Sequence, residues 1–169
     1  MTSEVRAEAG GPTFEFEPHN CFACGELNEH GLQLKLHLEE RRSWTEFVLD
    51  DRFEGWRGVT HGGIIATVLD EVMAWALVAE DNWGVTARMT IDFKRPVPVG
   101  TSVRAEGWIV HNRRRLVDTA GQIVDANGTL LASAEAVYVA ANEERKRELM
   151  ARYGVRIRNA RATGEGLSK

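Results

Sequence analysis

Two neighbouring carboxylates, Asp70 and Glu71, interrupt the most apolar stretch of this 169-residue sequence, Ile64–Ala79. A carboxylate among apolar groups is costly unless it is solvated, paired or neutralised. Two interpretations are open: both side chains face solvent or a subunit interface, or one is a catalytic base or nucleophile in a cleft. Because successive helical residues point about 100° apart, both carboxylates cannot serve the same reacting atom.

The residues just before this stretch, His61, Gly62 and Gly63, form a second chemical group. Glycines let a ligand's carbonyl approach the backbone, and the unpaired N–H groups of a first helical turn stabilise a developing oxyanion. Taken alone, the glycines would be a kink and the histidine a cap or packing residue. Beside a buried carboxylate, they predict an oxyanion site.

The third group is the segment Cys21-Phe22-Ala23-Cys24-Gly25. A Cys-x-x-Cys pair can be half of a zinc site, with His19 or His30 as nitrogen ligands. The sequence has no second cysteine pair and no thioredoxin-like unit around this one, so we prefer packing over a sheet edge to a metal or redox role. Two cysteines are too few for a disulfide framework, which favours a reducing cytoplasm.

The surrounding sequence predicts the elements that position these groups. Apolar residues of Ile64–Ala79 cover an arc of roughly 220°, so this helix must be wrapped on most sides. The other apolar segments alternate with period two and predict strands at Leu32–Glu39, Trp44–Leu49, Val85–Phe93, Thr101–Val110, Leu116–Asp125 and Thr129–Ala140. We therefore predict an α+β fold of order ββαββββ, with a curved antiparallel sheet around one central helix.

One domain is expected, over residues 19–140. Residues 1–18 lack any period and contain two glycines and a proline, which predicts a flexible arm. Residues 141–169 are rich in charge and predict an exposed helix followed by a solvated tail.

Charge and composition exclude several classes of function. The chain has 21 basic and 25 acidic side chains and a pI near 5.8, so no electrostatic argument favours nucleic acid. Thr67, Asp70 and Glu71 argue against Ile64–Ala79 as a membrane span, and the N-terminus has no apolar signal region. We therefore expect a cytoplasmic protein without a membrane partner.

From about Leu32 to Ala140 the sequence resembles the hotdog-fold acyl-CoA thioesterases, specifically the PaaI-like (phenylacetyl-CoA thioesterase) group of the 4-hydroxybenzoyl-CoA thioesterase superfamily. The resemblance is carried by Gly58–Glu71, Gly84–Phe93 and the turn Arg95–Gly100. It implies hydrolysis of an acyl-CoA to free acid and coenzyme A, without a metal or other cofactor. It also implies a homodimer or homotetramer with active sites at the subunit interface.

The resemblance assigns roles residue by residue. Asp70 matches the general base or nucleophile, and Gly63, with Gly62, matches the backbone donors that polarise the thioester carbonyl. His61 matches a histidine that orients the site. Thr86 falls where relatives carry a Ser or Thr donated by the neighbouring protomer.

Further substrate contacts are predicted at Glu71, which competes with Asp70 for the acidic role, and at Arg113 and Arg115, whose guanidiniums suit the phosphates of coenzyme A. Gly55 stands where many relatives have Asn or another polar residue. This departure leaves a non-catalytic acyl-CoA-binding protein as one alternative. A hotdog-fold hydratase is the other, and the position of His61 ahead of the helix argues against it.

Overall fold

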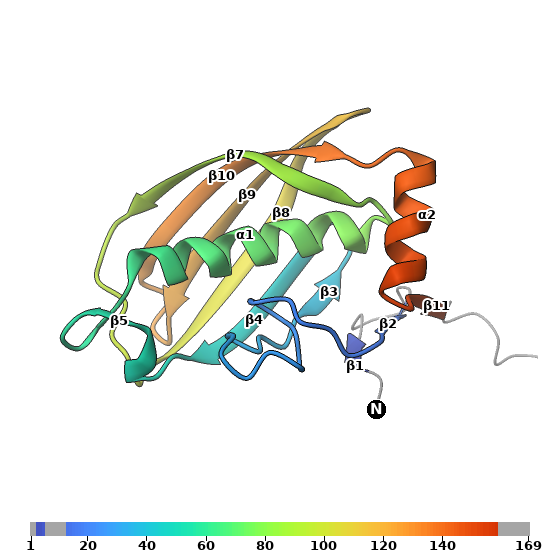
Figure 1. The fold of residues 1–169 in the computed structure, drawn as a ribbon. Coiled ribbons are helices and arrows are strands. Elements are labelled where there is room, and N and C mark those ends of the chain that lie inside the picture. The colour runs from blue at the N-terminus through green and yellow to red at the C-terminus, as the bar shows by residue number, and fades with distance from the viewer. Residues whose placement is uncertain (1–2, 6–12, 159–169) are drawn as a thin grey trace, which may run out of the picture.

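The computed structural model describes residues 3–5 and 13–158, and its main body is a curved antiparallel sheet around a long helix (Figure 1). The six strands of this sheet lie in the order β3-β4-β8-β9-β10-β7. Their bounds are β3 His37–Glu39, β4 Arg42–Val48, β7 Gly84–Phe93, β8 Ser102–Arg113, β9 Leu116–Asp125 and β10 Leu130–Ala140. All neighbours are antiparallel, and the predicted ββαββββ order is confirmed.

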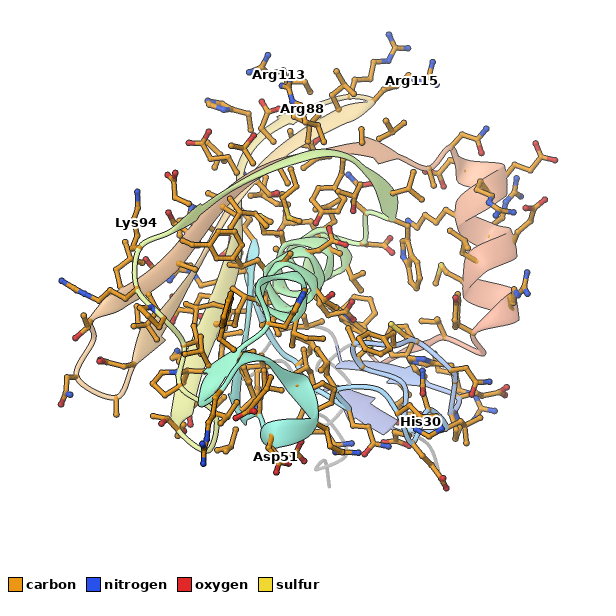
Figure 2. The ribbon with its side chains drawn as sticks, turned by 60° about the vertical axis from the view of Figure 1, so that its left-hand side comes forward. His30, Asp51, Arg88, Lys94, Arg113 and Arg115 are labelled. Carbon is orange, nitrogen blue, oxygen red and sulfur yellow. The ribbon has the colours of Figure 1, made fainter. Side chains whose placement is uncertain are left out.

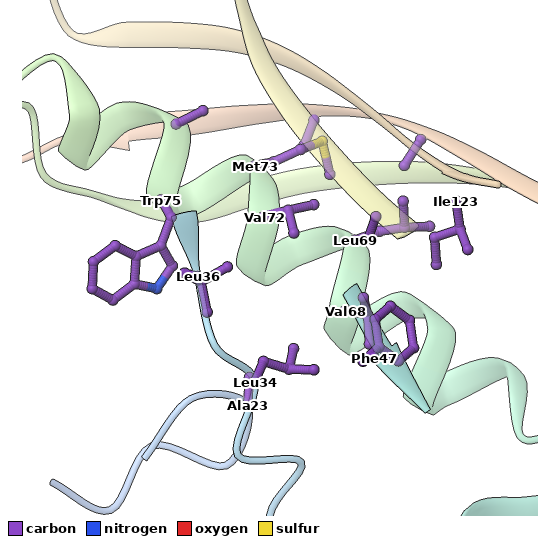
Figure 3. Close-up of a cluster of buried hydrophobic side chains, with 14 of the residues drawn as sticks. Ala23, Leu34, Leu36, Phe47, Val68, Leu69, Val72, Met73, Trp75 and Ile123 are labelled. Atoms are coloured by element: carbon purple, nitrogen blue, oxygen red, sulfur yellow. The ribbon is translucent and has the colours of Figure 1, made fainter. Parts of the chain in front are cut away.

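Helix α1, Gly62–Ala79, lies in the hollow of this sheet, and Figure 2, viewed nearly along the helix, shows the sheet arching around it. Figure 3 shows its apolar side chains packed with Phe47 of β4 and Ile123 of β9. The helix is long and apolar enough to cross a membrane by length and composition, but in this fold it is the core helix. Its side chains without exposed surface are Val68, Leu69, Val72, Met73, Ala76 and Leu77.

Close packing against β8 sets the rotation of α1. A Cβ atom on Gly107 would lie 2.5 Å from the backbone of Val72, so only glycine allows this approach. On β4, the Ser43 hydroxyl donates a 2.5 Å hydrogen bond to the Val72 carbonyl. Asp70 lies two residues, or about 200°, around the helix from Val72, so its side chain points away from β8.

Short elements hold the start of α1. They are the 3-10 helix η1, Asp51–Phe53, and the paired strands β5, Glu54–Trp56, and β6, Val59–Thr60. The N–H of Thr60 donates to the Val97 carbonyl at 2.9 Å, and that of His61 donates to the Phe53 carbonyl at 2.8 Å. The chain therefore enters α1 in one defined direction.

The segment Leu32–Glu39 is paired as a strand only over β3. The N–H groups of Leu32 and Leu34 instead donate to the carbonyls of Phe22 and Ala23, at 2.8 and 2.9 Å. The predicted strand is therefore divided, because its first half pairs with the cysteine segment and not with β4.

The N-terminal residues differ from the predicted flexible arm. Strand β2, Thr13–Phe16, lies between β1, Ser3–Val5, and β11, Arg156–Arg158. Phe14 and Phe16 are buried, and the Phe16 ring lies 4.8 Å from that of Trp75. The structure corrects the arm at residues 3–5 and 13–16, which form a small antiparallel sheet whose third strand, β11, comes from the far end of the chain. Residues 1–2 and 6–12 lie outside the described residues.

The C-terminal region keeps the predicted charged helix, α2, Glu143–Arg152, whose N-cap Asn142 accepts a hydrogen bond from the Arg145 N–H. Strand β11 follows where a solvated tail is predicted, so the tail is corrected at residues 156–158. The predicted tail beyond them, residues 159–169, lies outside the described residues.

Candidate active site

Asp70 is held by two hydroxyl groups from the strands that cover α1. Thr86 of β7 donates to Asp70 Oδ1 at 2.6 Å, and Tyr138 of β10 donates to the same oxygen at 2.7 Å. The Tyr138 hydroxyl also lies 2.9 Å from the Asp70 carbonyl oxygen. The second carboxylate oxygen, Oδ2, has no hydrogen bond with any described residue. One oxygen is thus fixed and the other is available to a reactant.

Tyr138 is a site residue that the sequence analysis missed. Its side chain has no exposed surface, and burial, followed by the nearby charge of Asp70, raises the pKa of its hydroxyl well above the usual range. It therefore stays protonated and acts as a donor. The available signal was an inward-facing tyrosine on a strand over a helix, because a buried hydroxyl needs a partner.

The start of α1 presents one free amide. His61 is the N-cap, and its Nδ1 accepts the Gly63 N–H at 2.9 Å. Its carbonyl accepts the N–H groups of Ile64 and Ile65, at 2.9 and 3.2 Å. The N–H of Gly62 has no acceptor among the described residues. Of the two amides predicted to polarise a carbonyl, Gly62 is available and Gly63 is engaged.

Gly55, the departure from the resembled pattern, lies against His61. A Cβ atom there would lie 3.0 Å from the His61 Cα and 3.2 Å from its Cδ2. The histidine therefore occupies space that a polar side chain at position 55 would need.

The predicted donors and the predicted base are far apart within one chain. Gly62 and Asp70 are separated by eight residues of one helix, which corresponds to about 12 Å along the axis. A single carbonyl group cannot contact both, so within one chain the predicted donor and the predicted base do not meet at one point.

Glu71 faces a different neighbourhood from Asp70. Its Oε1 accepts the Trp75 Nε1–H at 2.8 Å, and both of its carboxylate oxygens lie 4.0 Å from the Cys21 Sγ. Burial raises the pKa of Glu71 to about 7. The hydroxyls of Thr86 and Tyr138 contact Asp70 and not Glu71. Glu71, which the sequence predicted as a substrate contact, therefore lies outside the Asp70 site.

The predicted phosphate-binding arginines also lie apart from Asp70. Arg113 and Arg115 sit at the turn between β8 and β9, and Figure 2 shows both above the arch of β7, away from α1. The Arg113 Nη2 lies 2.8 Å from Asp118 Oδ2. Arg115 lines a hollow with Arg114 and residues 140–143 at the start of α2. Within one chain these residues do not complete the Asp70 site.

The sequence and the fold of this chain match known proteins. Residues 57–132 match the family model of the thioesterase superfamily. The acyl-coenzyme A thioesterase THEM4 of Xenopus laevis is 34% identical over 92 residues, which are 54% of this chain and 41% of that protein. Over these residues the chain is similar to proteins of the thioesterase superfamily. The matched region spans less than half the length of this relative.

Several solved structures have a fold similar to that of this chain. A thioesterase superfamily crystal structure is 26% identical with a TM-score of 0.68, covering 71% of this chain and 60% of that one. PaaI of E. coli is 19% identical with a TM-score of 0.62, covering 66% and 81%. A Streptococcus mutans protein bound to acetyl-CoA is 17% identical with a TM-score of 0.63, covering 70% and 98%. The hotdog fold is thereby confirmed.

Proposed function

We propose that the chain hydrolyses an acyl-CoA thioester to a free acid and coenzyme A, with Asp70 as the general base or nucleophile. The observation that carries the proposal is the Asp70 carboxylate, which is fixed through Oδ1 by Thr86 and Tyr138 while Oδ2 stays open. The similarity to a curated acyl-CoA thioesterase supports the reaction class and the coenzyme.

We propose further that a second copy supplies the oxyanion donor. Strand β7 is the last strand of its sheet and exposes Val85 and Phe93, by 68% and 58%. An apolar edge strand of this length is a template for pairing with another chain. Such pairing would make a homodimer through a continuous sheet.

The ends of β7 show what antiparallel pairing would bring together. A Cβ atom on Gly62 would lie 3.6 Å from the Phe93 ring, so the Phe93 end of β7 lies beside the start of α1. The Thr86 end of β7 lies beside Asp70. Antiparallel pairing of two β7 strands sets the Phe93 end of one against the Thr86 end of the other. Gly62 of one copy then approaches Asp70 of its partner.

This arrangement revises the expected role of Thr86. The resemblance implied a threonine donated by the neighbouring protomer, whereas here Thr86 bonds Asp70 of its own chain. The group that must come from the other copy is the start of α1, because about 12 Å of helix separates Gly62 from Asp70 in one chain.

The chemistry follows from these positions. As a base, Asp70 takes a proton from water, the resulting hydroxide attacks the thioester carbonyl, and the Gly62 N–H stabilises the oxyanion. Collapse of this intermediate breaks the carbon–sulfur bond, and the coenzyme thiolate regains the proton from Asp70. As a nucleophile, Asp70 instead attacks the thioester carbonyl, breaks the carbon–sulfur bond and expels the coenzyme thiolate, which leaves a mixed anhydride. Water then hydrolyses the anhydride to the free acid and the Asp70 carboxylate, and the proton released goes to the thiolate.

The test is release of free thiol from short, medium, long and aromatic acyl-CoAs. Asp70→Asn is expected to lower kcat on the best substrate by at least about 100-fold, the contribution of a positioned base. Asp51→Asn, an exposed carboxylate of η1, is the matched control. Near wild-type turnover by Asp70→Asn would refute the proposed mechanism.

A non-catalytic acyl-CoA-binding protein is the second candidate. It is favoured by the engaged Gly63 amide and by Gly55. Tight binding of acyl-CoA by calorimetry, with no thiol release across the panel, would select it. For either function the unpaired Cys21 and Cys24 support the proposal of a reducing, cytoplasmic location.

A further inference from the structure

We propose that Cys21, Cys24 and Glu71 form a binding site for a zinc-class divalent metal ion, separate from the Asp70 site. The two cysteines come from the N-terminal segment, residues 19–25, and the carboxylate comes from the middle of α1. This site does not depend on the proposed thioesterase activity.

The ligand atoms already lie close to a binding geometry. The sulfur atoms and a Glu71 oxygen are all within 4.8 Å of one another, and the Cys21 Sγ lies 4.0 Å from both carboxylate oxygens. Zinc bonds of about 2.3 Å to sulfur and about 2.1 Å to oxygen place tetrahedral ligands about 3.6 Å apart. An ion would therefore draw these atoms together by less than the movement of one rotamer.

A backbone turn brings the two cysteines together. The Gly25 N–H donates to the Cys21 carbonyl at 2.9 Å, which closes the Cys-x-x-Cys loop into a tight turn. A Cβ atom on Gly25 would lie 2.4 Å from the Cys21 nitrogen, so this turn requires glycine. Because the loop is preformed, binding would cost little conformational entropy.

The charges favour a cation at this point. Glu71 is partly buried, and its hydrogen-bond partners are the Trp75 Nε1–H and the Cys21 thiol. No basic side chain of the described residues pairs with it. A partly buried carboxylate that has no cation beside it carries a desolvation cost, and a divalent ion would reduce that cost. Thiolate ligands select zinc over magnesium or calcium.

The site differs from the one considered on sequence spacing. The candidate nitrogen ligands were His19 and His30, but neither belongs to the cluster. The His19 Nδ1 instead accepts the Cys21 N–H at 3.3 Å. Glu71 takes the third position, and a water molecule would complete a tetrahedron. The ion would tie residues 19–25 to α1.

The experiment uses the full chain, purified under reducing conditions with and without added Zn²⁺, and measures metal by elemental analysis. Titration with Co²⁺ follows, because thiolate-to-cobalt charge-transfer and tetrahedral d–d bands report the ligands directly. We expect one metal ion per chain. The cobalt spectrum should show charge-transfer bands with the intensity of two thiolate ligands.

Variants separate the ligands from bystanders. Cys21→Ser and Cys24→Ser are expected to lose the ion, and Glu71→Gln to weaken zinc binding at least about tenfold, since even indirect ligand partners contribute this much. His30→Ala and Glu144→Gln are the matched controls and should bind as the wild type.

The proposal is overturned if the reduced chain binds no zinc and shows no thiolate–cobalt band. It is also overturned if Glu71→Gln binds as tightly as the wild type, which would leave a site made by cysteines alone. Circular dichroism shows whether Glu71→Gln is folded. His30→Ala, measured with the same metal, shows how much a substitution outside the site changes the affinity.

Discussion

The Gly62 amide offers a substitution that removes one hydrogen-bond donor and little else. Gly62 is the first residue of α1, where proline is well tolerated because its N–H has no helical acceptor. The preceding His61 has φ −60° and ψ 134°, a conformation that suits a residue before proline. A side chain at position 62 meets only the Phe93 ring, at an ordinary 3.6 Å. Gly62→Pro should therefore fold normally.

The expected effect of Gly62→Pro is on the rate alone. Loss of one oxyanion donor lowers kcat by about 100-fold to 1,000-fold, or about 2.7–4 kcal/mol. Gly62→Ala keeps the N–H and has the same contact with Phe93, so it should retain kcat within about threefold. Steady-state thiol release gives kcat, and thermal unfolding confirms that both variants are folded.

Mixing two inactive variants tests whether the site spans two chains. In a heterodimer of Asp70→Asn with Gly62→Pro, one site regains an intact Gly62 from the first chain and an intact Asp70 from the second. Random assembly should therefore restore about one quarter of the wild-type activity, because half of the dimers are mixed and each has one intact site.

Two results would refute this reasoning. Full activity of the Gly62→Pro enzyme would show that the free amide does not stabilise the oxyanion. Absence of recovery in mixtures, when differently tagged chains are shown to co-purify, would show that Gly62 and Asp70 act within one chain.

Three further predictions follow from the contacts. Tyr138→Phe keeps the buried ring but removes the hydrogen bond to the Asp70 carboxylate, which is worth about 1.5–3 kcal/mol. We therefore expect kcat to fall by about 10-fold to 100-fold while KM changes little. An unchanged kcat would mean that Thr86 alone orients Asp70. If Arg115 binds a coenzyme phosphate, Arg115→Ala should raise KM for acyl-CoA several-fold and leave kcat unchanged. Arg147→Ala on α2 is the control. Equal effects of the two substitutions on KM would show that Arg115 does not bind the phosphate. For protein held at a zinc concentration 100 times Kd, removal of the zinc by a chelator should lower the free energy of unfolding by about 2.7 kcal/mol. A melting temperature that does not change when the chelator is added would contradict the Cys21–Cys24–Glu71 site.

The elements of the fold could be predicted where their signals are local. The patterns that predict the strands and the apolar helix lie in residues close together in the sequence, and the structure confirms the order of these elements. Strand β2 escaped prediction because its polar–apolar alternation spans only four residues, Thr13–Phe16, and one of its two partner strands, β11, lies at the other end of the chain. The predicted first strand was shortened because its first half pairs with the backbone of the cysteine segment.

The candidate site divides in the same way. Asp70, His61, Gly62 and Gly63 could be proposed from the sequence because they lie on one helix and at its start, and helical geometry follows from sequence spacing alone. Tyr138 could not be identified, because it reaches Asp70 from a strand 68 residues away. The same holds for Cys21 and Glu71, which are 50 residues apart.

By itself, the sequence determined that a helix with two adjacent carboxylates lies inside an antiparallel sheet, since hydrophobic periodicity specifies which faces are buried. Only the tertiary structure decided that the two carboxylates face different partners. Asp70 meets hydroxyl groups and Glu71 meets thiols, because adjacent helical residues point about 100° apart and different strands and loops cover each direction. Which group lies in each direction depends on long-range packing, and no local pattern in the sequence records it.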